Sequence, residues 1–232
     1  MKIAITQPYL FPYIGYFQLI NAVDKFVLLD TVNFINRGWI NRNRIVVNGK
    51  EHMISIPLQK ASQNRIIKDL RLAADTAWQV KFMNTLRHSY HQAPNFSEAY
   101  PLIEAVISRK ETHITDLIRH SITVINDYLG IRTEIIPTSS DYHNDELKGA
   151  HKILDICTKE GADEYINPIG GMELYDRGQF SRQAIKLNFL RTKAIRYRQT
   201  ADPFIPNLSI IDVLMNNSRT ETIDLLTQFE LV

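Results

Sequence analysis

Residues 2–30 read KIAITQPYLFPYIGYFQLINAVDKFVLLD, and this stretch decides the fold class. Residues 2–5 are a short apolar strand candidate, which ends at Gln7-Pro8 because proline cannot donate a hydrogen bond to a sheet. Apolar and aromatic residues between 9 and 20 have the spacing of one helix face, and residues 25–30 resemble a second buried strand. Strand, loop, helix and strand in this order predict a βαβ unit with two parallel strands.

A second βαβ unit is predicted further along the chain. Residues 133–137 and 163–168 are strand candidates, and between them residues 145–160 have a helical pattern with Asp145 and Glu146 in the first turn. Apolar and polar residues alternate over 185–189, which predicts a half-buried strand. Residues 210–217 and 219–228 are predicted to form closing helices.

The middle of the chain follows other patterns. Residues 44–50 and 52–57 form two β-rich runs, with Asn48-Gly49 near the end of the first. This dipeptide between two such runs is a strong hairpin signal. Apolar residues then recur at helical spacing up to Gly130, which predicts a helix stop. We therefore expect one α/β domain over residues 1–232, with a parallel-sheet, Rossmann-like and nucleotidylyltransferase-like core, a β-hairpin and a mainly helical insertion at about 75–130.

Composition excludes several functional classes. The chain has 232 residues, with 27 Lys and Arg against 25 Asp and Glu, so a dominant polyanion partner and a nucleic-acid groove are not expected. Its single cysteine, Cys157, excludes an intramolecular disulfide and a cysteine-cluster metal site. We expect no metal and no cofactor. The first apolar run is too short for a signal peptide and no run of about 20 apolar residues occurs, so a cytoplasmic protein without a membrane partner is expected.

The loops that follow the first two strands are the first candidate site, because ligands of parallel α/β sheets bind beyond the carboxyl ends of strands. Gln7, Tyr13 and Asp30 lie there, although Gln7 and Asp30 are also suited to capping a turn. The frame of Tyr13, Gly15 and Tyr16 resembles the His-x-Gly-His loop of nucleotidylyltransferases with both histidines replaced. Tyrosine can bind a phosphate but cannot supply a cation near neutral pH.

Two basic stretches are candidates for anion binding. In Trp39-Ile-Asn41-Arg42-Asn43-Arg44, an extended chain places the two amides on one side and the two guanidiniums on the other, with Trp39 as a stacking wall. A charged edge strand that resists aggregation is the alternative. Between Asp176 and Asp202 there are seven Lys and Arg residues and no acid. This block could attract a phosphorylated ligand, or it could be a solvated face balanced by the acidic residues of 141–176.

These motifs together resemble the WbqC-like protein family. The likeness runs through residues 7–17, 30–34, 39–44, 165–180 and 208–216, in the family's order. The family often has tryptophan at the position of Tyr13, and often a lysine near Asn36-Arg37. Four residues within these motifs are our candidates for catalysis: Gln7, Tyr13, Asp30 and Asp212. Twelve others are candidates for substrate binding: Tyr16, Trp39, Asn41, Arg42, Asn43, Arg44, Asn167, Gly170, Gly171, Tyr175, Ser209 and Asn216.

The resemblance implies an enzyme of surface polysaccharide biosynthesis, in O-antigen or capsule loci, and glycyl or other acyl transfer to an amino sugar. The expected partners are a nucleotide sugar and an acyl or aminoacyl donor, with a homo-oligomer possible. The diphosphate would lie against Arg42, Arg44 or the basic block, and Asp30 or Asp212 would be the base. Two alternatives stay open: a degenerate nucleotidylyltransferase-like activating enzyme, and a sugar-nucleotide-binding protein without catalysis.

Overall fold

The computed structural model describes all 232 residues, and its centre is a six-stranded sheet. The strand order is β10-β9-β8-β1-β2-β7, and every neighbouring pair is parallel except β9 with β10. The prediction of an α/β protein with a mostly parallel sheet is therefore confirmed. The strands are β1 (Lys2–Thr6), β2 (Lys25–Leu28), β7 (Glu134–Ile136), β8 (Glu164–Pro168), β9 (Lys186–Thr192) and β10 (Phe229–Leu231).

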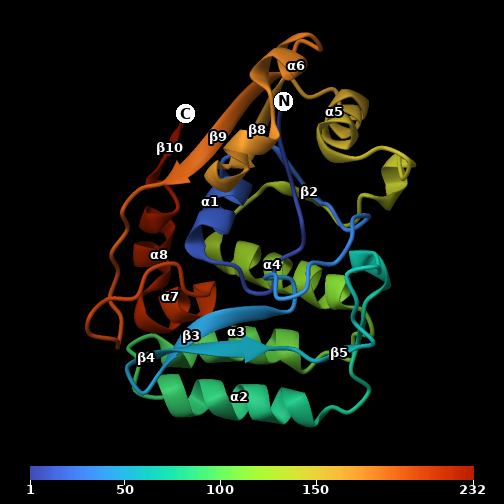
Figure 1. The fold of residues 1–232 in the computed structure, drawn as a ribbon. Helices are drawn as coiled ribbons and strands as arrows, with labels where there is room; N and C mark the ends of the chain where they lie inside the picture. Colours follow the sequence, from blue (N-terminus) through green and yellow to red (C-terminus); the bar gives the residue numbers. More distant parts are fainter.

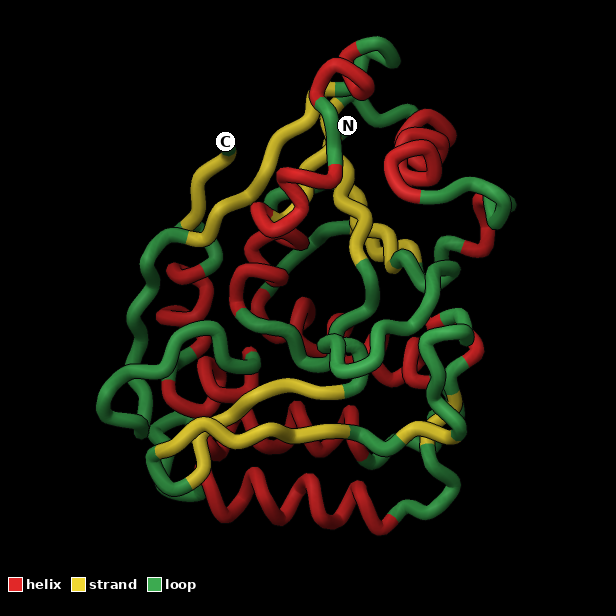
Figure 2. Tube along the Cα trace, in the orientation of Figure 1, coloured by secondary structure: helices red, strands yellow, loops and turns green.

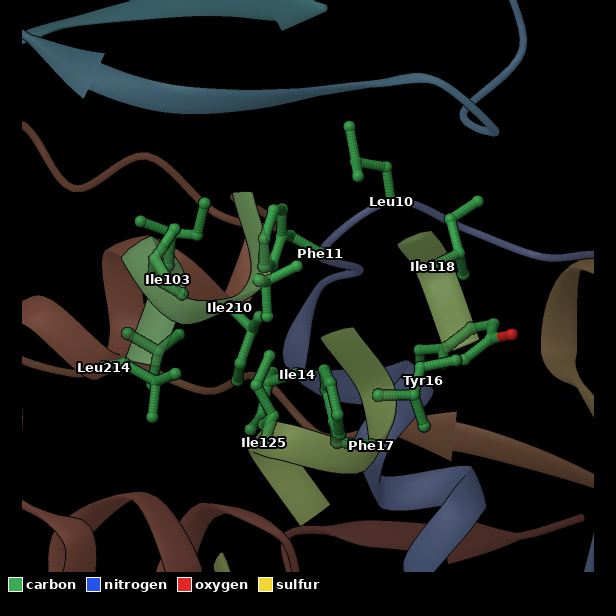
Figure 3. Close-up of a cluster of buried hydrophobic side chains, with 14 of the residues drawn as sticks. Leu10, Phe11, Ile14, Tyr16, Phe17, Ile103, Ile118, Ile125, Ile210 and Leu214 are labelled. Atoms are coloured by element: carbon green, nitrogen blue, oxygen red, sulfur yellow. The ribbon is translucent and has the colours of Figure 1, made fainter. Parts of the chain in front are cut away.

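Helices cover both faces of this sheet. Successive residues of a strand point to opposite faces, so a single strand contributes side chains to both cores. In β1, Ile3 and Ile5 pack with α5 and α6, whereas Ala4 belongs to the larger core on the other face. That larger core includes residues of α1, α4 and α7, some of which Figure 3 labels, and Leu225 of α8. The helices are α1 (Ile14–Asn21), α4 (Ile114–Leu129), α5 (Gly149–Lys159), α6 (Arg177–Ser181), α7 (Ile210–Asn216) and α8 (Arg219–Leu225).

The chain between β2 and α4 forms a separate layer, which lies below the sheet in Figure 1. The predicted hairpin is confirmed: β3 (Arg42–Val47) and β4 (Lys50–Ser55) are antiparallel around Asn48-Gly49, where both residues have positive φ. Next come β5 (Leu58–Gln59), β6 (Arg71–Leu72), α2 (Ala77–Tyr90) and α3 (Phe96–Ile107). Gly130 ends α4 in the left-handed conformation, as predicted. That the chain is one domain with a helical insertion stays a prediction.

Some sequence predictions were wrong in detail. The first helix begins at Ile14, because residues 9–13 form a loop whose carbonyls bond to other elements. The helix predicted over 145–160 begins at Gly149, so Asp145 and Glu146 precede its first turn. Residues 187–190 are all buried, since β9 lies between two strands and under helices on both faces. The last predicted helix ends at Leu225, and β10 follows it. No helix combines the length and the apolar character needed to cross a membrane.

Candidate functional site

The chain adds later strands first on one side of β1 and then on the other, and a cavity lies near this change of side. From β1 the chain adds β2 and β7 on one side of the sheet, and later adds β8, β9 and β10 on the other. Such a switch point opens a crevice beyond the carboxyl ends of the strands. A cavity of about 390 Å³ includes residues that follow β1 and β8; it is lined by Tyr9, Tyr13, Trp39, Arg44, Ile169, Leu190, Thr192 and Asn207.

The loop between β1 and α1 is held in one shape by two buried polar side chains. The Asn43 amide is fully buried and donates to the carbonyls of Leu10 (2.9 Å) and Phe11 (2.6 Å). Ser209, also fully buried, donates from Oγ to the Phe11 carbonyl at 2.7 Å. Phe11 has φ of 40°, a conformation that costs a bulky residue energy and persists only when its surroundings hold it. Asn43 and Ser209 supply that support.

Further contacts fix the start of α1. The Ile210 amide donates to the Pro12 carbonyl at 2.8 Å, and the buried Tyr16 hydroxyl donates to the Gln7 carbonyl at 3.2 Å. A Cβ on Gly15 would clash with the Tyr13 ring and with Thr192, so the helix can approach the cavity wall this closely only with glycine. The Gln7 side chain is half-buried and makes no hydrogen bond within the protein. Its amide is therefore free for a ligand.

Aromatic rings form one wall of the cavity. Tyr9 and Trp39 stack with ring centroids 6.0 Å apart, and Tyr9 and Tyr13 lie 6.4 Å apart. Burial raises the pKa of both tyrosine hydroxyls, so they stay protonated at neutral pH. The wall therefore offers flat apolar faces together with two O–H donors.

Arg42 and Arg44 lie on the same side of β3, as the alternation predicts. Their guanidinium carbons are 5.6 and 5.2 Å from the centre of the Trp39 ring, within the range of cation–π attraction. Arg44 also pairs with Glu51 at 2.9 Å and donates to the Asn207 carbonyl, but its Nε is buried without a partner. Arg42 donates to the Gly38 carbonyl at 2.7 Å. Asn41 instead donates to the Ile56 carbonyl.

The turn after β8 supports the Ile169 wall. Asn167 is buried, accepts from the Tyr165 hydroxyl at 2.9 Å and donates to the Pro168 carbonyl at 3.0 Å. Tyr175 packs edge-on against Tyr165. A Cβ on Gly171 would clash with the Asn167 amide, whereas one on Gly170 would meet nothing within 4 Å. The contacts of Asn167, Gly171 and Tyr175 are thus within the protein.

Asp30 lies at the end of β2 and does not line the cavity. Only 3% of it is exposed, and its Oδ1 accepts from the Thr138 hydroxyl (2.9 Å) and from the Ser139 amide (2.9 Å) and hydroxyl (3.1 Å). These bonds join the end of β2 to the loop after β7. In this structure Asp30 fixes two strand ends.

Asp212 is fully buried within a network of hydroxyl and amide donors. Its Oδ1 accepts from the Tyr90 hydroxyl at 2.8 Å, and its Oδ2 accepts from the Tyr197 hydroxyl at 2.9 Å and the Gln199 amide at 2.8 Å. Asn216, one turn later, donates to the Asp212 carbonyl. Burial raises the pKa of Asp212 despite these donors. The carboxyl group ties α7 to α2 and to the loop after β9.

The structure brings Tyr13, Trp39 and Arg44 together at the cavity, whereas Asp30, Asn43, Asn167, Ser209 and Asp212 are buried and do not line it. Tyr9, Ile169, Leu190, Thr192 and Asn207 were missed as lining residues. Three of these belong to, or directly follow, β8 and β9, so the same strand-end rule could have found them. Burial raises the pKa of the Cys157 thiol to about 12, which suppresses its reactivity. No group of three or more His, Cys, Asp or Glu residues could hold a metal ion.

Comparison with known proteins gives the chain a family. The model of the WbqC-like protein family matches residues 7–223, and the chain belongs to this family, which is linked in general to polysaccharide biosynthesis. The chain is 29% identical over 218 residues to an uncharacterized protein of Mycobacterium tuberculosis (strain ATCC 25618 / H37Rv), Rv1507c, with 93% of each chain covered. No solved structure matches.

Proposed function

We propose that this member of the WbqC-like family is a transferase that acts on a nucleotide-activated amino sugar in the biosynthesis of a surface polysaccharide such as O-antigen or capsule. The transferred group is a glycyl or another acyl group, and the acceptor is the sugar's amine. The observation that carries the proposal is the pairing of an aromatic wall with Arg44 in one strand-end cavity.

Each part of a nucleotide sugar has a counterpart in this cavity. Trp39 is 39% exposed, so part of its surface is free to contact a base or a sugar ring. Arg44 presents a guanidinium oriented by Trp39 and Glu51, and a guanidinium matches two phosphate oxygens in geometry. Tyr9 and Tyr13 can donate to sugar or phosphate oxygens, since their hydroxyls stay protonated. That Gln7 contacts the sugar or the transferred group stays a prediction, because Gln7 does not line the cavity.

The cavity has no serine or cysteine among its lining residues, and the hydroxyl of Thr192 donates to the Gln18 amide oxygen at 2.8 Å, with no base beside it among the lining residues. Acyl transfer through a covalent enzyme intermediate therefore has no obvious nucleophile there, and direct attack of the sugar amine on an activated donor is the simpler chemistry. The predictions that Asp30 or Asp212 acts as the base stay predictions. Their bonds give both residues a role in fixing strand and helix ends, whatever their part in proton transfer.

In the nucleotidylyltransferase-like alternative, Tyr13 and Tyr16 stand where two histidines contact the ligand, but Tyr16 does not line the cavity. Tyr16 is only 5% exposed, and its hydroxyl bonds to the Gln7 carbonyl. Only Tyr13 of the Tyr-Ile-Gly-Tyr frame lines the cavity.

The proposal also includes a cytoplasmic location, a homo-oligomer, and a nucleotide sugar and an acyl donor as substrates.

A thermal-shift screen tests the proposed function. Nucleotide-linked amino sugars, acyl donors and nucleoside triphosphates are added separately, and a ligand that binds only the folded chain raises the melting temperature. At a concentration of about 100 Kd the gain is about 2.7 kcal/mol, which shifts the melting of a domain of this size by several degrees. We expect a shift with nucleotide sugars. A shift with triphosphates alone, together with magnesium-dependent release of pyrophosphate, would instead favour an activating enzyme.

A screen hit is followed by a transfer assay. The bound nucleotide sugar is incubated with each acyl donor, and the mass of an acylated product is sought. Tight binding without any product in every combination would favour the binding protein over the transferase.

A further inference from the structure

A second cavity adjoins the first at the end of β9. Its volume is about 610 Å³, and it shares Thr192 and Asn207 with the cavity that contains Trp39. Its other walls come mainly from the loop of residues 193–209, which joins β9 to α7 and is drawn green in Figure 2. The two cavities therefore lie side by side at the carboxyl end of β9.

The side chains that line this second cavity carry positive charge and no negative charge. Lys193 and Arg196 line it, and no Asp or Glu does. Neither cation forms an ion pair within the protein, whereas Arg44 pairs with Glu51 and Arg191 pairs with Glu230. Two unpaired cations beside a concave surface attract an oxyanion.

The loop that carries these cations is held in shape before any ligand binds. The Gln199 side chain accepts from the Ile205 amide at 2.8 Å and donates to the Ile205 carbonyl at 3.1 Å, which closes the loop on itself. Tyr197 donates to Asp212, which anchors the loop on α7. A pre-formed cavity spares the ligand part of the cost of ordering the protein.

Aromatic packing also orients one of the cations. Phe204 packs edge-on against Tyr197 with ring centroids 5.1 Å apart, and the Arg196 guanidinium lies 5.8 Å from the centre of the Phe204 ring. Half of the lining residues are hydrophobic. The cavity thus combines an oriented guanidinium and an ammonium with an apolar floor.

We infer that this second cavity binds a separate, phosphorylated organic co-substrate, with its phosphate oxygens on Lys193 and Arg196 and its apolar part against Phe204. Its identity as the activated acyl donor rests on the proposed function. The shared Thr192 and Asn207 then mark the boundary at which the donor meets the acceptor sugar. The unpaired cations of the basic block would accordingly serve a second ligand, distinct from the nucleotide sugar on Arg44.

Calorimetric titration with inorganic pyrophosphate tests this second site, in buffer without divalent cations. The double variant Lys193→Ala/Arg196→Ala removes both cavity cations. Arg182→Ala/Lys186→Ala is the matched control, because it removes the same charge from exposed positions before and at the start of β9, which do not line the cavity. At about 0.1 M salt, exposed charges more than about 10 Å away are largely screened. We expect at least tenfold weaker binding in the cavity variant and less than threefold weakening in the control.

A second titration is made in the presence of a saturating nucleotide sugar. Binding of pyrophosphate should persist, because the two ligands occupy different cavities. Three results would overturn the inference: no binding to the wild-type chain at millimolar pyrophosphate, equal losses in the two double variants, or displacement of pyrophosphate by the nucleotide sugar. If pyrophosphate binds through Lys193 and Arg196 but no nucleotide sugar binds anywhere, the second site stands and the proposed function fails.

Discussion

Asn43 fixes the loop after β1 through a single amide group. Replacing it with alanine removes its bonds to the Leu10 and Phe11 carbonyls; the Phe11 carbonyl keeps its bond from Ser209, and an unsatisfied buried carbonyl costs about 1–3 kcal/mol. We expect Asn43→Ala to lower the free energy of unfolding in urea by about 2 kcal/mol or more. Asn41→Ala, which removes one bond at a half-buried position, is the control and should lose about 1 kcal/mol. Equal losses would contradict the role assigned to Asn43.

The two neighbouring glycines after β8 should differ sharply in tolerance. A methyl group at Gly171 would overlap the Asn167 amide, and overpacking typically costs about 1–3 kcal/mol. At Gly170 the added methyl would meet open space, so Gly170→Ala should change stability by less than about 0.5 kcal/mol. Urea unfolding of both variants measures the difference. A tolerant Gly171 and a sensitive Gly170 would mean that the turn has another shape.

On the scale of elements, Asp212 joins three pieces of the chain, and its titration should be visible in stability. Its pKa is raised above the ordinary value of 3.8 by burial, so near this pH the folded chain holds the proton more tightly than the unfolded chain. The stability that the neutral group contributes is present below pH 3.8 and is lost as the pH rises through the raised native pKa.

Asp212→Asn removes this titration while keeping the size of the side chain. The free energy of unfolding of the wild type minus that of the variant should therefore fall as the pH rises from about 4 toward neutrality. Urea unfolding of both proteins at several pH values measures this difference. A difference that stays constant, or one that grows with pH, would show that Asp212 does not titrate as described.

The sequence predicts the helices and strands themselves better than it predicts where they begin and which loops connect them. The parallel strands and the hairpin depend on local patterns such as the apolar run at 26–29 and Asn48-Gly49, and the structure has them. The start of α1 depends on bonds from Asn43, Ser209 and Ile210, which come from distant segments. No local periodicity could reveal that residues 9–13 form a loop.

The same limit applies to the site on the scale of the whole molecule. Tyr13, Trp39 and Arg44 could be proposed because each lies in an unusual local motif. Asn207 could not, since it lies in the loop that joins β9 to α7 and its place at the cavity depends on how that loop folds back. Buried polar residues such as Asn43 and Ser209 look like ligand contacts in the sequence, because both roles require a specific hydrogen-bonding side chain.

The near-neutral total charge also conceals a local arrangement. Arg44 and the unpaired Lys193 and Arg196 line two adjacent cavities, whereas Arg191 is neutralised by Glu230 on the outer strand pair. A net charge of +2 is thus compatible with a focused anionic site and gives little long-range attraction.

Binding of a nucleotide-linked amino sugar at Trp39 is the central claim, and tryptophan fluorescence tests it most directly. The chain has two tryptophans, and Trp78 does not line the Trp39 cavity, so the Trp78→Phe protein reports on Trp39 alone. Titration with UDP-linked and other nucleotide-linked amino sugars should change this fluorescence saturably. Adding Arg44→Ala should weaken binding about tenfold or more, since a charge-assisted hydrogen bond contributes about 1.5–3 kcal/mol. A folded Trp78→Phe protein with no saturable change for any nucleotide sugar, or with binding indifferent to Arg44, would contradict the account.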